Sequence, residues 1–398
     1  MMVRTLAARS AATAVLVALA LVSAGAATEG VTDNEILLGT HLDLSGPVAA
    51  SMPQIRNGMQ MRIDEVNEAG GVNGRKIRLI VEDNGSQPQM AVRAVQKLTS
   101  SDHVFAIVNP FGSGTNAAVV KRATDAGVIY FSPWAAAKPL HAISSSPLLF
   151  TTTENYDVTT ATGLAWMLDK YKAKRVGVIY QEGPFGDLAR AGVTSVLAAH
   201  NLKPVAEASY TVGDIDFSSQ VARMRAADAE IIVVAALIRE TVGVMSEVKK
   251  LGWSSVKVMA AQPSTNEDTT NLGKAVVDGL YGVATFNVYY PSDAPGSVKT
   301  WMASYRKRFN NLEPSDTAYL SYGFTDWFIK NGLAASGKDL TTDKVVKALT
   351  STSYSSPLFY DAKRFNDGYL APETVQVEQI QSGEWKKISA VIPPVAVK

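Results

Sequence analysis

The sequence predicts an α/β protein built from two doubly wound parallel-sheet lobes. Three observations predict this fold: apolar strand-like runs alternate with segments of helical periodicity, the alternation breaks near residues 149–155, and it then resumes. Strands that alternate with helices of about 10–15 residues form βαβ units and therefore a parallel sheet. Right-handed crossovers place the helices on both faces of each sheet.

The first series begins with the apolar run at 35–39 and a helix over 53–69, whose apolar residues recur every three or four positions. Gly70 and Gly71 end this helix, because glycine readily adopts the left-handed conformation found at helix C-termini. The series continues with a strand at 77–81, a helix at 88–100, a strand at 104–108, a helix from about 115 to 126 and a strand at 128–131.

The second series has the same alternation. We expect helices at 158–171, 186–200, 217–227 and 240–251, and strands at 175–180, 205–210, 230–236, 256–260 and 280–284. The strand at 230–236 is almost continuously apolar, as strands buried on both faces are. Ligands of open parallel sheets bind beyond the carboxyl ends of the strands, so two facing lobes should enclose one cleft.

Composition excludes several classes of protein. Lys and Arg total 38 against 37 Asp and Glu, a balance that offers no electrostatic attraction for nucleic acid. The chain has no cysteine, so disulfides, thiolate nucleophiles and iron–sulfur clusters are impossible. None of the 4 histidines has metal-ligand spacing, and no G-x-S-x-G motif is present. We therefore expect no metal, no cofactor and no enzyme activity.

The first residues are typical of a secretory signal peptide. Arg4 and Arg9 precede an apolar run at 11–22, and small residues follow at 23–27. This run is shorter than the ~20 residues that a membrane-spanning helix needs. We expect export to the periplasm, with residues 1–26 removed after Ala26.

Loops at the predicted strand ends offer candidate binding residues. Ser113 lies between two glycines where a helix starts, so free N–H groups, the helix dipole and the hydroxyls of Ser113 and Thr115 favour an anion such as a carboxylate. A tight turn with a helix cap would explain the same residues equally well. Trp134 and Phe185 follow other strands, and each fits either a cleft wall or the core.

Short motifs run in a fixed order through the chain after residue 30. They are ILLG at 36–39, LSGP at 44–47, NG at 57–58, AGGVNGRKI at 69–77, VEDN at 81–84, FGSGT at 111–115, SP at 132–133, FG at 185–186, DFS at 216–218 and DG at 278–279. In this order they resemble the periplasmic leucine/isoleucine/valine-binding protein family, the type I solute-binding subunits of ABC importers.

The resemblance implies a type I periplasmic binding protein whose two lobes are joined by a three-segment hinge. Lobe one would comprise residues 30–152 plus 286–356, and lobe two residues 153–285 plus 360–392. The hinge segments would lie near 151–153, 284–286 and 357–359. Ligand would close the cleft, and the closed form would dock on a membrane permease.

The resemblance also implies where a ligand is held. Ser113 and the backbone N–H groups of Ala135 and Ala136 would bind a carboxylate. Amino acid-binding members usually have a small residue in place of Trp134, a threonine in place of Ala136, and an aromatic hydroxyl in place of Phe185. Their acidic partner of the ligand ammonium falls at Gln262 here, which favours an acid without an ammonium, while an amino acid remains open.

The sequence thus predicts an extracytoplasmic solute-binding protein, acting as a monomer, for an amino acid or an aromatic or apolar organic acid. Ser113 and Trp134 would contact this ligand from lobe one. Phe185 and Gln262 would contact it from lobe two, with Thr115, Tyr156 and Glu240 as further candidates. The alternative is a ligand-sensing domain that acts on a receptor or regulator, because the same fold serves sensing.

Overall fold

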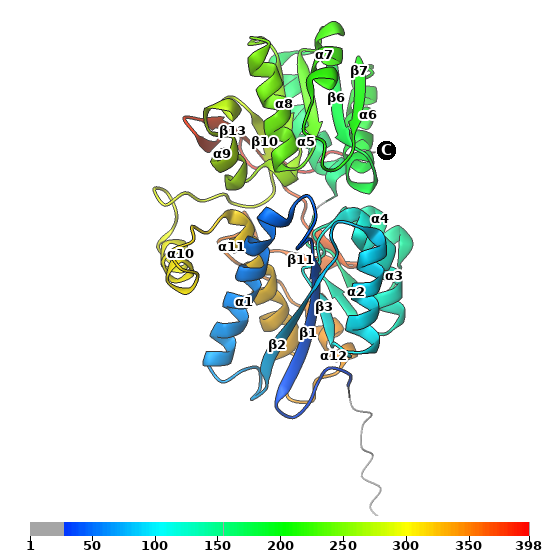
Figure 1. Cartoon of the computed structure of the whole chain (residues 1–398), viewed down its shortest axis with the longest axis vertical. Helices are drawn as coiled ribbons and strands as arrows, with labels where there is room; N and C mark the ends of the chain where they lie inside the picture. Colours follow the sequence, from blue (N-terminus) through cyan, green and yellow to red (C-terminus); the bar gives the residue numbers. More distant parts are fainter. Residues whose placement is uncertain (1–27, 154, 398) are drawn as a thin grey trace, which may run out of the picture.

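The computed structural model describes residues 28–153 and 155–397. They form two α/β lobes, each with its own sheet, joined by segments that cross in the middle of the molecule (Figure 1). The predicted fold class is confirmed. The expected signal peptide at 1–26 lies outside the described residues. Among those residues, no helix is long and apolar enough to cross a membrane.

Lobe one, the lower half of Figure 1, is built on a parallel sheet of strand order β2-β1-β3-β4-β5. Successive residues of β1 point to opposite faces, and both faces are buried: Leu38 packs towards α1, and Leu37 towards α2 and α3. The elements are β1 (Glu35–Leu42), η1 (Ala49–Ser51), α1 (Met52–Glu68), β2 (Lys76–Asp83), α2 (Pro88–Ser100), β3 (Ala106–Val108), α3 (Ser113–Asp125), β4 (Ile129–Phe131), α4 (Ala137–Ile143) and β5 (Leu149–Phe150).

Lobe two, the upper half, has a sheet of order β14-β13-β10-β9-β8-β6-β7. Every residue of β8 is buried, as its continuous apolar run predicts. The elements are α5 (Tyr156–Tyr171), β6 (Val176–Gln181), α6 (Pro184–Ala199), β7 (Ala206–Tyr210), α7 (Ser218–Ala226), β8 (Ile231–Ala235), α8 (Ile238–Lys250), β9 (Lys257–Ala260), η2 (Gln262–Ser264), α9 (Glu267–Gly273), η3 (Lys274–Val277) and β10 (Tyr281–Ala284).

After β10 the chain returns to lobe one. It forms α10 (Gly296–Arg308), α11 (Asp316–Trp327), the π-helix η4 (Phe328–Ala334), α12 (Thr342–Ser351), and the hairpin β11 (Arg364–Asn366) and β12 (Tyr369–Ala371). It then re-enters lobe two and extends the sheet with two antiparallel strands: β13 (Gln376–Gln381) pairs with β10, and β14 (Glu384–Lys387) pairs with β13.

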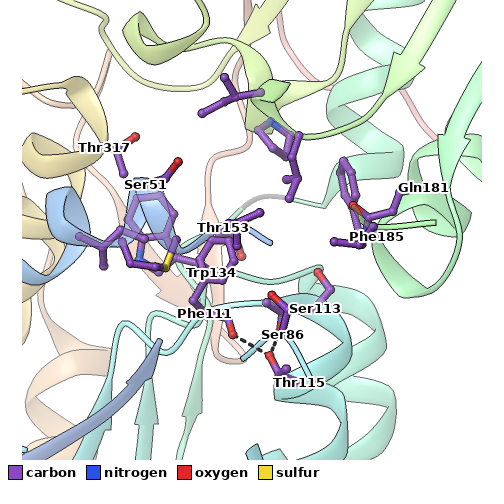
Figure 2. Close-up of a pocket in the computed structure, with 18 of the residues that line it drawn as sticks. Ser51, Ser86, Phe111, Ser113, Thr115, Trp134, Thr153, Gln181, Phe185 and Thr317 are labelled. Atoms are coloured by element: carbon purple, nitrogen blue, oxygen red, sulfur yellow. Dashed lines mark hydrogen bonds between the residues drawn. The ribbon is translucent and has the colours of Figure 1, made fainter. Parts of the chain in front are cut away.

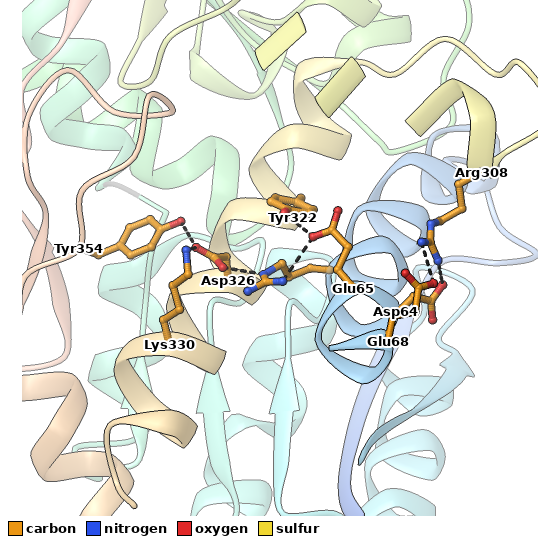
Figure 3. Close-up of polar contacts among 9 residues, drawn as sticks. Asp64, Glu65, Glu68, Arg308, Tyr322, Asp326, Lys330 and Tyr354 are labelled. Atoms are coloured by element: carbon orange, nitrogen blue, oxygen red, sulfur yellow. Dashed lines mark hydrogen bonds and ion pairs between the residues drawn. The ribbon is translucent and has the colours of Figure 1, made fainter. Parts of the chain in front are cut away.

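Helix α11 packs closely along α1. A Cβ atom on Gly58 would lie 2.2 Å from the carbonyl oxygen of Ala318, so only glycine allows this approach. An ion pair and a hydrogen bond reinforce the contact (Figure 3): the Arg62 guanidinium lies 2.6 Å from Asp326, and the Tyr322 hydroxyl donates to Glu65. Helix α1 therefore fixes the direction of α11, whose first turn reaches the gap between the lobes.

The β11–β12 hairpin lies on lobe one, although the sequence places residues from 360 onward in lobe two. Phe365 packs against Phe131 and Phe150, and the N–H of Thr151 donates to Gly368. We therefore propose that the third crossing lies at about 372–375 instead of 357–359. Local patterning could not locate this crossing, because the packing of Phe365 is long-range.

Candidate functional site

A cavity of about 490 Å³ lies between the lobes. The loops that follow β1, β3 and β4 line it from lobe one, and those that follow β6, β8 and β9 line it from lobe two. Figure 2 shows Ser113 and Trp134 reaching it from lobe one, and Gln181 and Phe185 from lobe two. The carboxyl ends of both sheets thus meet at one cavity, as the topology of parallel sheets predicts.

The structure brings most of the predicted site residues to this cavity, and two of them lie outside it. Ala135 and Ala136 are completely buried and do not line the cavity. The predicted residues that line it are Ser113, Thr115, Trp134, Tyr156, Phe185, Glu240 and Gln262.

Ser113 is the first residue of α3, two positions before the predicted helix start. Its Oγ accepts a hydrogen bond of 2.8 Å from the N–H of Ala136. The N–H of Ala135 donates to the carbonyl of Pro133. The backbone groups expected to hold a ligand are therefore already bonded within the protein. The Ala136 N–H orients Ser113, whose hydroxyl proton remains available to the cavity.

Thr115 fixes the loop that carries Ser113. Its Oγ1 lies 2.6 Å from the Phe111 carbonyl and 2.9 Å from that of Gly112. Gly112 has a φ of 100°, and a Cβ atom there would lie 2.5 Å from Thr115 Oγ1. The loop consequently needs glycine at this position. The Thr115 hydroxyl points back to the loop, so this residue positions Ser113.

A buried polar network, which the sequence analysis did not predict, lies beneath the same loop. His41 Nε2 is 2.9 Å from the Tyr130 hydroxyl, which donates to Asn116. Asn116 donates to the Gly112 carbonyl, and Asn84 donates to the Phe111 carbonyl. Burial lowers the pKa of His41 to about 3, so the ring is neutral. Of these residues only Asn84 directly follows a strand, while His41 and Tyr130 lie within strands and Asn116 within α3, so the sequence offered little signal for this network.

Trp134 forms part of an apolar wall of the cavity. Its indole packs edge-on against Phe324 of α11, with ring centroids 6.0 Å apart. Met52 and Ile55 of α1 and Leu320 of α11 complete this wall. The sequence did not single out these four helical residues, because their periodicity equally fits a core face. Trp134 therefore both lines the cavity and packs against the core, which are the two positions that its sequence context allowed.

Phe185 and Tyr156 form a second, smaller apolar surface. Phe185 lies in the first turn of α6, and its ring meets the Tyr156 ring edge-on at 5.0 Å. Both side chains are at least nine-tenths buried and pack with Ala136, Ala189, Ala235 and Ala261. They present only a small area to the cavity.

The charged groups of the cavity all come from lobe two. Among the described residues that line it, they are Glu182, Arg239 and Glu240. Glu240 is 1% exposed; its Oε1 lies 3.1 Å from the Arg239 guanidinium, and its Oε2 has no hydrogen-bond partner in the described part of the chain. Gln262, from η2, adds an uncharged amide beside them. Buried carboxylate oxygens are normally hydrogen-bonded, so the buried Glu240 Oε2 is an unused acceptor of a residue that lines the cavity.

No metal centre accompanies these groups. Within residues 28–153 and 155–397, no cluster of three or more His, Cys, Asp or Glu side chains could hold an ion. The cavity therefore offers hydroxyl and backbone donors on one side, a carboxylate acceptor on the other, and apolar surface between them.

This arrangement of two hinged lobes around a polar and apolar cavity defines a binding protein of the type I periplasmic fold. The sequence model of the family described as "Periplasmic binding protein" matches residues 35–384, and the chain belongs to this family. The resemblance stated from the sequence motifs is confirmed.

A relative from Rhizobium johnstonii, the Leu/Ile/Val-binding protein BraC3, is 29% identical over 198 residues. That alignment covers 50% of this chain and 53% of the relative, so the chain spans about half of the length of this protein in the match.

Two solved structures share the fold. The fatty acid ABC transporter substrate-binding protein from Thermomonospora curvata superposes with a TM-score of 0.80 at 23% identity, covering 92% of this chain and 94% of that chain. The branched-chain amino acid transporter substrate binding protein LivJ from Streptococcus pneumoniae, solved with isoleucine, gives 0.77 at 23% identity and covers 91% and 100%.

Proposed function

We propose that this chain is an exported solute-binding protein that delivers a small carboxylate-bearing ligand to the permease of an ABC importer. The interlobe cavity carries the proposal, because Ser113 at the start of α3 meets it from one lobe and Glu240 from the other. Such a protein acts by binding alone, as a monomer, and ligand shifts its population towards a closed form.

Lobe one holds the carboxylate. The first N–H groups of α3 have no partner within the helix, and the positive end of the helix dipole favours an anion there. The Ser113 hydroxyl adds a directed donor at the same place. Fatty acids and isoleucine, named for the two similar structures, share a carboxylate, which supports this choice.

The apolar wall takes the body of the ligand. Met52, Ile55, Trp134, Leu320 and Phe324 form a continuous surface beside Ser113. A volume of about 490 Å³ lies within the ~300–1,000 Å³ range of small-molecule sites. A ligand of this size buries a branched, aromatic or acyl group against Trp134, which contributes roughly 25 cal/mol for each Å² removed from water.

Lobe two receives a hydrogen-bond donor of the ligand. A plain acid would add negative charge to a cavity that already holds Glu182 and Glu240, and Arg239 is paired with Glu240. An ammonium or hydroxyl group near the carboxylate would instead satisfy Glu240 Oε2. This acceptor favours an amino or hydroxy acid, whereas Gln262 led the sequence-based expectation towards an acid without an ammonium.

A thermal-shift screen of the protein without residues 1–26 tests this function. The probes are matched sets: leucine, 2-hydroxy-4-methylpentanoate and 4-methylpentanoate, and the corresponding series from phenylalanine. A ligand that binds the folded state raises the melting temperature by mass action. We expect shifts from the amino or hydroxy acids that exceed those from the plain acids.

The Ser113→Ala variant sharpens the test. We expect binding of the best probe to weaken by more than about tenfold, as loss of a charge-assisted hydrogen bond of ~1.5–3 kcal/mol implies. Ser218→Ala is the matched control, since Ser218 also begins a helix but lies on α7 outside the cavity. If Ser113→Ala titrates like the unaltered protein, the carboxylate anchor is wrong.

A further inference from the structure

The lobes also touch beside the cavity, where the N-termini of α9 and α11 meet. The N–H of Glu267 in lobe two donates to Asp316 Oδ1 in lobe one, at 3.3 Å. In the reverse direction, the Thr317 hydroxyl donates to Asp268 Oδ2, also at 3.3 Å. Each helix start therefore supplies a carboxylate to the other lobe. Thr317 also lines the cavity, and both bonds join the two lobes, so separation of the lobes would break them.

Three carboxylates are thereby brought together across the gap. Asp316 is 5% exposed, and its Oδ2 and the Oε2 of Glu267 have no hydrogen-bond partner among the described residues. The nearby cation Arg306 lies 2.8 Å from Glu313, which already neutralises it. The other titratable or charged groups around the cluster are Glu313, Glu384, Tyr290 and Tyr305.

The protonation of these groups depends on the contact. Burial raises the pKa of Glu267 to about 7, and the adjacent Asp268 adds to the rise. Burial, followed by the charges of Asp268 and Glu267, raises the pKa of Asp316 well above its usual value, and burial also raises the pKa of Asp268. Separation of the lobes would return water to all three carboxylates and lower these pKa values.

We propose that the α9–α11 contact is a proton-sensitive latch between the lobes, which favours the closed cleft when its carboxylates are protonated and opens it when they are charged. The sign follows from linkage: the state with the raised pKa values binds more protons, so falling pH favours it. For Glu267 the sensitive window runs from its ordinary value of 4.5 up to about 7. The latch acts on the closure equilibrium and needs no ligand.

Interlobe distance in the ligand-free protein measures this equilibrium directly. The chain has no cysteine, so Lys121→Cys in lobe one and Lys250→Cys in lobe two, both on exposed side chains, can carry a fluorescent donor and acceptor. Between pH 7.5 and pH 5.5 we expect the ratio of closed to open molecules to rise at least about threefold.

Glu267→Gln tests the group whose sensitive window spans these pH values, because it removes the charge and leaves the backbone N–H bonded to Asp316. We expect a closed fraction at pH 7.5 that matches the unaltered protein at pH 5.5, with less than half of its pH response. Asp343→Asn is the matched control, since Asp343 is an exposed acid in the first turn of α12, and it should retain the full response. Asp316→Asn, which keeps the acceptor for the Glu267 N–H, replaces Glu267→Gln if the latter fails to fold.

Two results would overturn the latch: a ratio that does not change with pH in the unaltered protein, or a full response in the folded Asp316→Asn or Glu267→Gln variant. Neither result bears on ligand binding. Failure of the proposed function would appear separately, as the absence of any thermal shift with the probes.

Discussion

The two walls of the cavity differ in chemistry, although both lobes are doubly wound α/β layers. Lobe one supplies hydroxyl groups, a helix N-terminus and apolar side chains, and none of its described lining residues is charged. Lobe two supplies Glu182, Arg239 and Glu240. One wall therefore suits an anion and an apolar body, and the other suits a hydrogen-bond donor. We therefore expect a ligand to lie with its carboxylate and apolar body towards lobe one and its hydrogen-bond donor towards lobe two.

The two walls also differ in how their loops are held. In lobe one, Asn84 and Asn116 donate to carbonyl groups of the Ser113 loop from below, and His41 contacts the amide of Asn84. In lobe two, the first turn of α6 lies so close to β6 that a Cβ atom on Gly186 would be 1.8 Å from the Gln181 carbonyl oxygen. A polar network holds one loop and close packing holds the other, and both position the residues that face the ligand.

Of the changes to the two walls, removal of the Trp134 ring should weaken ligand binding most. We expect Trp134→Ala to weaken binding of the best probe by about a hundredfold, or ~2.7 kcal/mol, because lobe one would lose the centre of its apolar wall. Isothermal titration measures the change. Phe185→Ala, which alters the smaller apolar surface of lobe two, should cost less than about tenfold. Equal losses would show that both lobes grip the apolar body.

Neutralising Glu240 should have the next largest effect. Glu240→Gln should weaken binding of the amino or hydroxy acid by about thirtyfold, because a buried hydrogen bond to a charged group contributes roughly 1.5–3 kcal/mol. The matched plain acid should bind the variant at least as well as it binds the unaltered protein. Titration of both probes checks this, and a parallel loss for the two would refute the donor-accepting role of lobe two.

The smallest expected effect concerns His41 beneath the lobe-one loop. Burial lowers its pKa to about 3, whereas in the unfolded chain it takes up a proton below about 6.5. His41 therefore lowers the free energy of unfolding as pH falls from about 6.5 towards 3. Relative to His41→Gln, the unaltered protein should lose about 1 kcal/mol of unfolding free energy between pH 7 and pH 5.5.

Urea unfolding at the two pH values measures the His41 contribution. His200→Gln, altered at an exposed histidine outside the cavity, is the control. Identical pH dependence in the unaltered protein and His41→Gln would mean that the folded state accommodates the charged ring.

Local sequence patterns were enough to predict the lobes and the loop that carries Ser113. The strands and helices follow from apolar periodicity, and the glycines around Ser113 mark the start of a helix. Local patterns could not predict that Ser113 Oγ accepts from the Ala136 N–H, because that bond joins two loops only after β3 and β4 pair. The position of the β11–β12 hairpin was missed for the same reason.

The sequence by itself determined the α/β class, the two series of strands, the family and the edge at which a ligand could bind. The class, the strands and the edge follow from periodicities and turn residues that act over a few positions. The family follows from the resemblance of the ordered motifs. Only the tertiary structure decided which atoms remain free at that edge. Among the described residues Glu240 Oε2 has no hydrogen-bond partner, whereas the N–H of Ala136 has one, because hydrogen bonding and burial depend on residues distant in the chain.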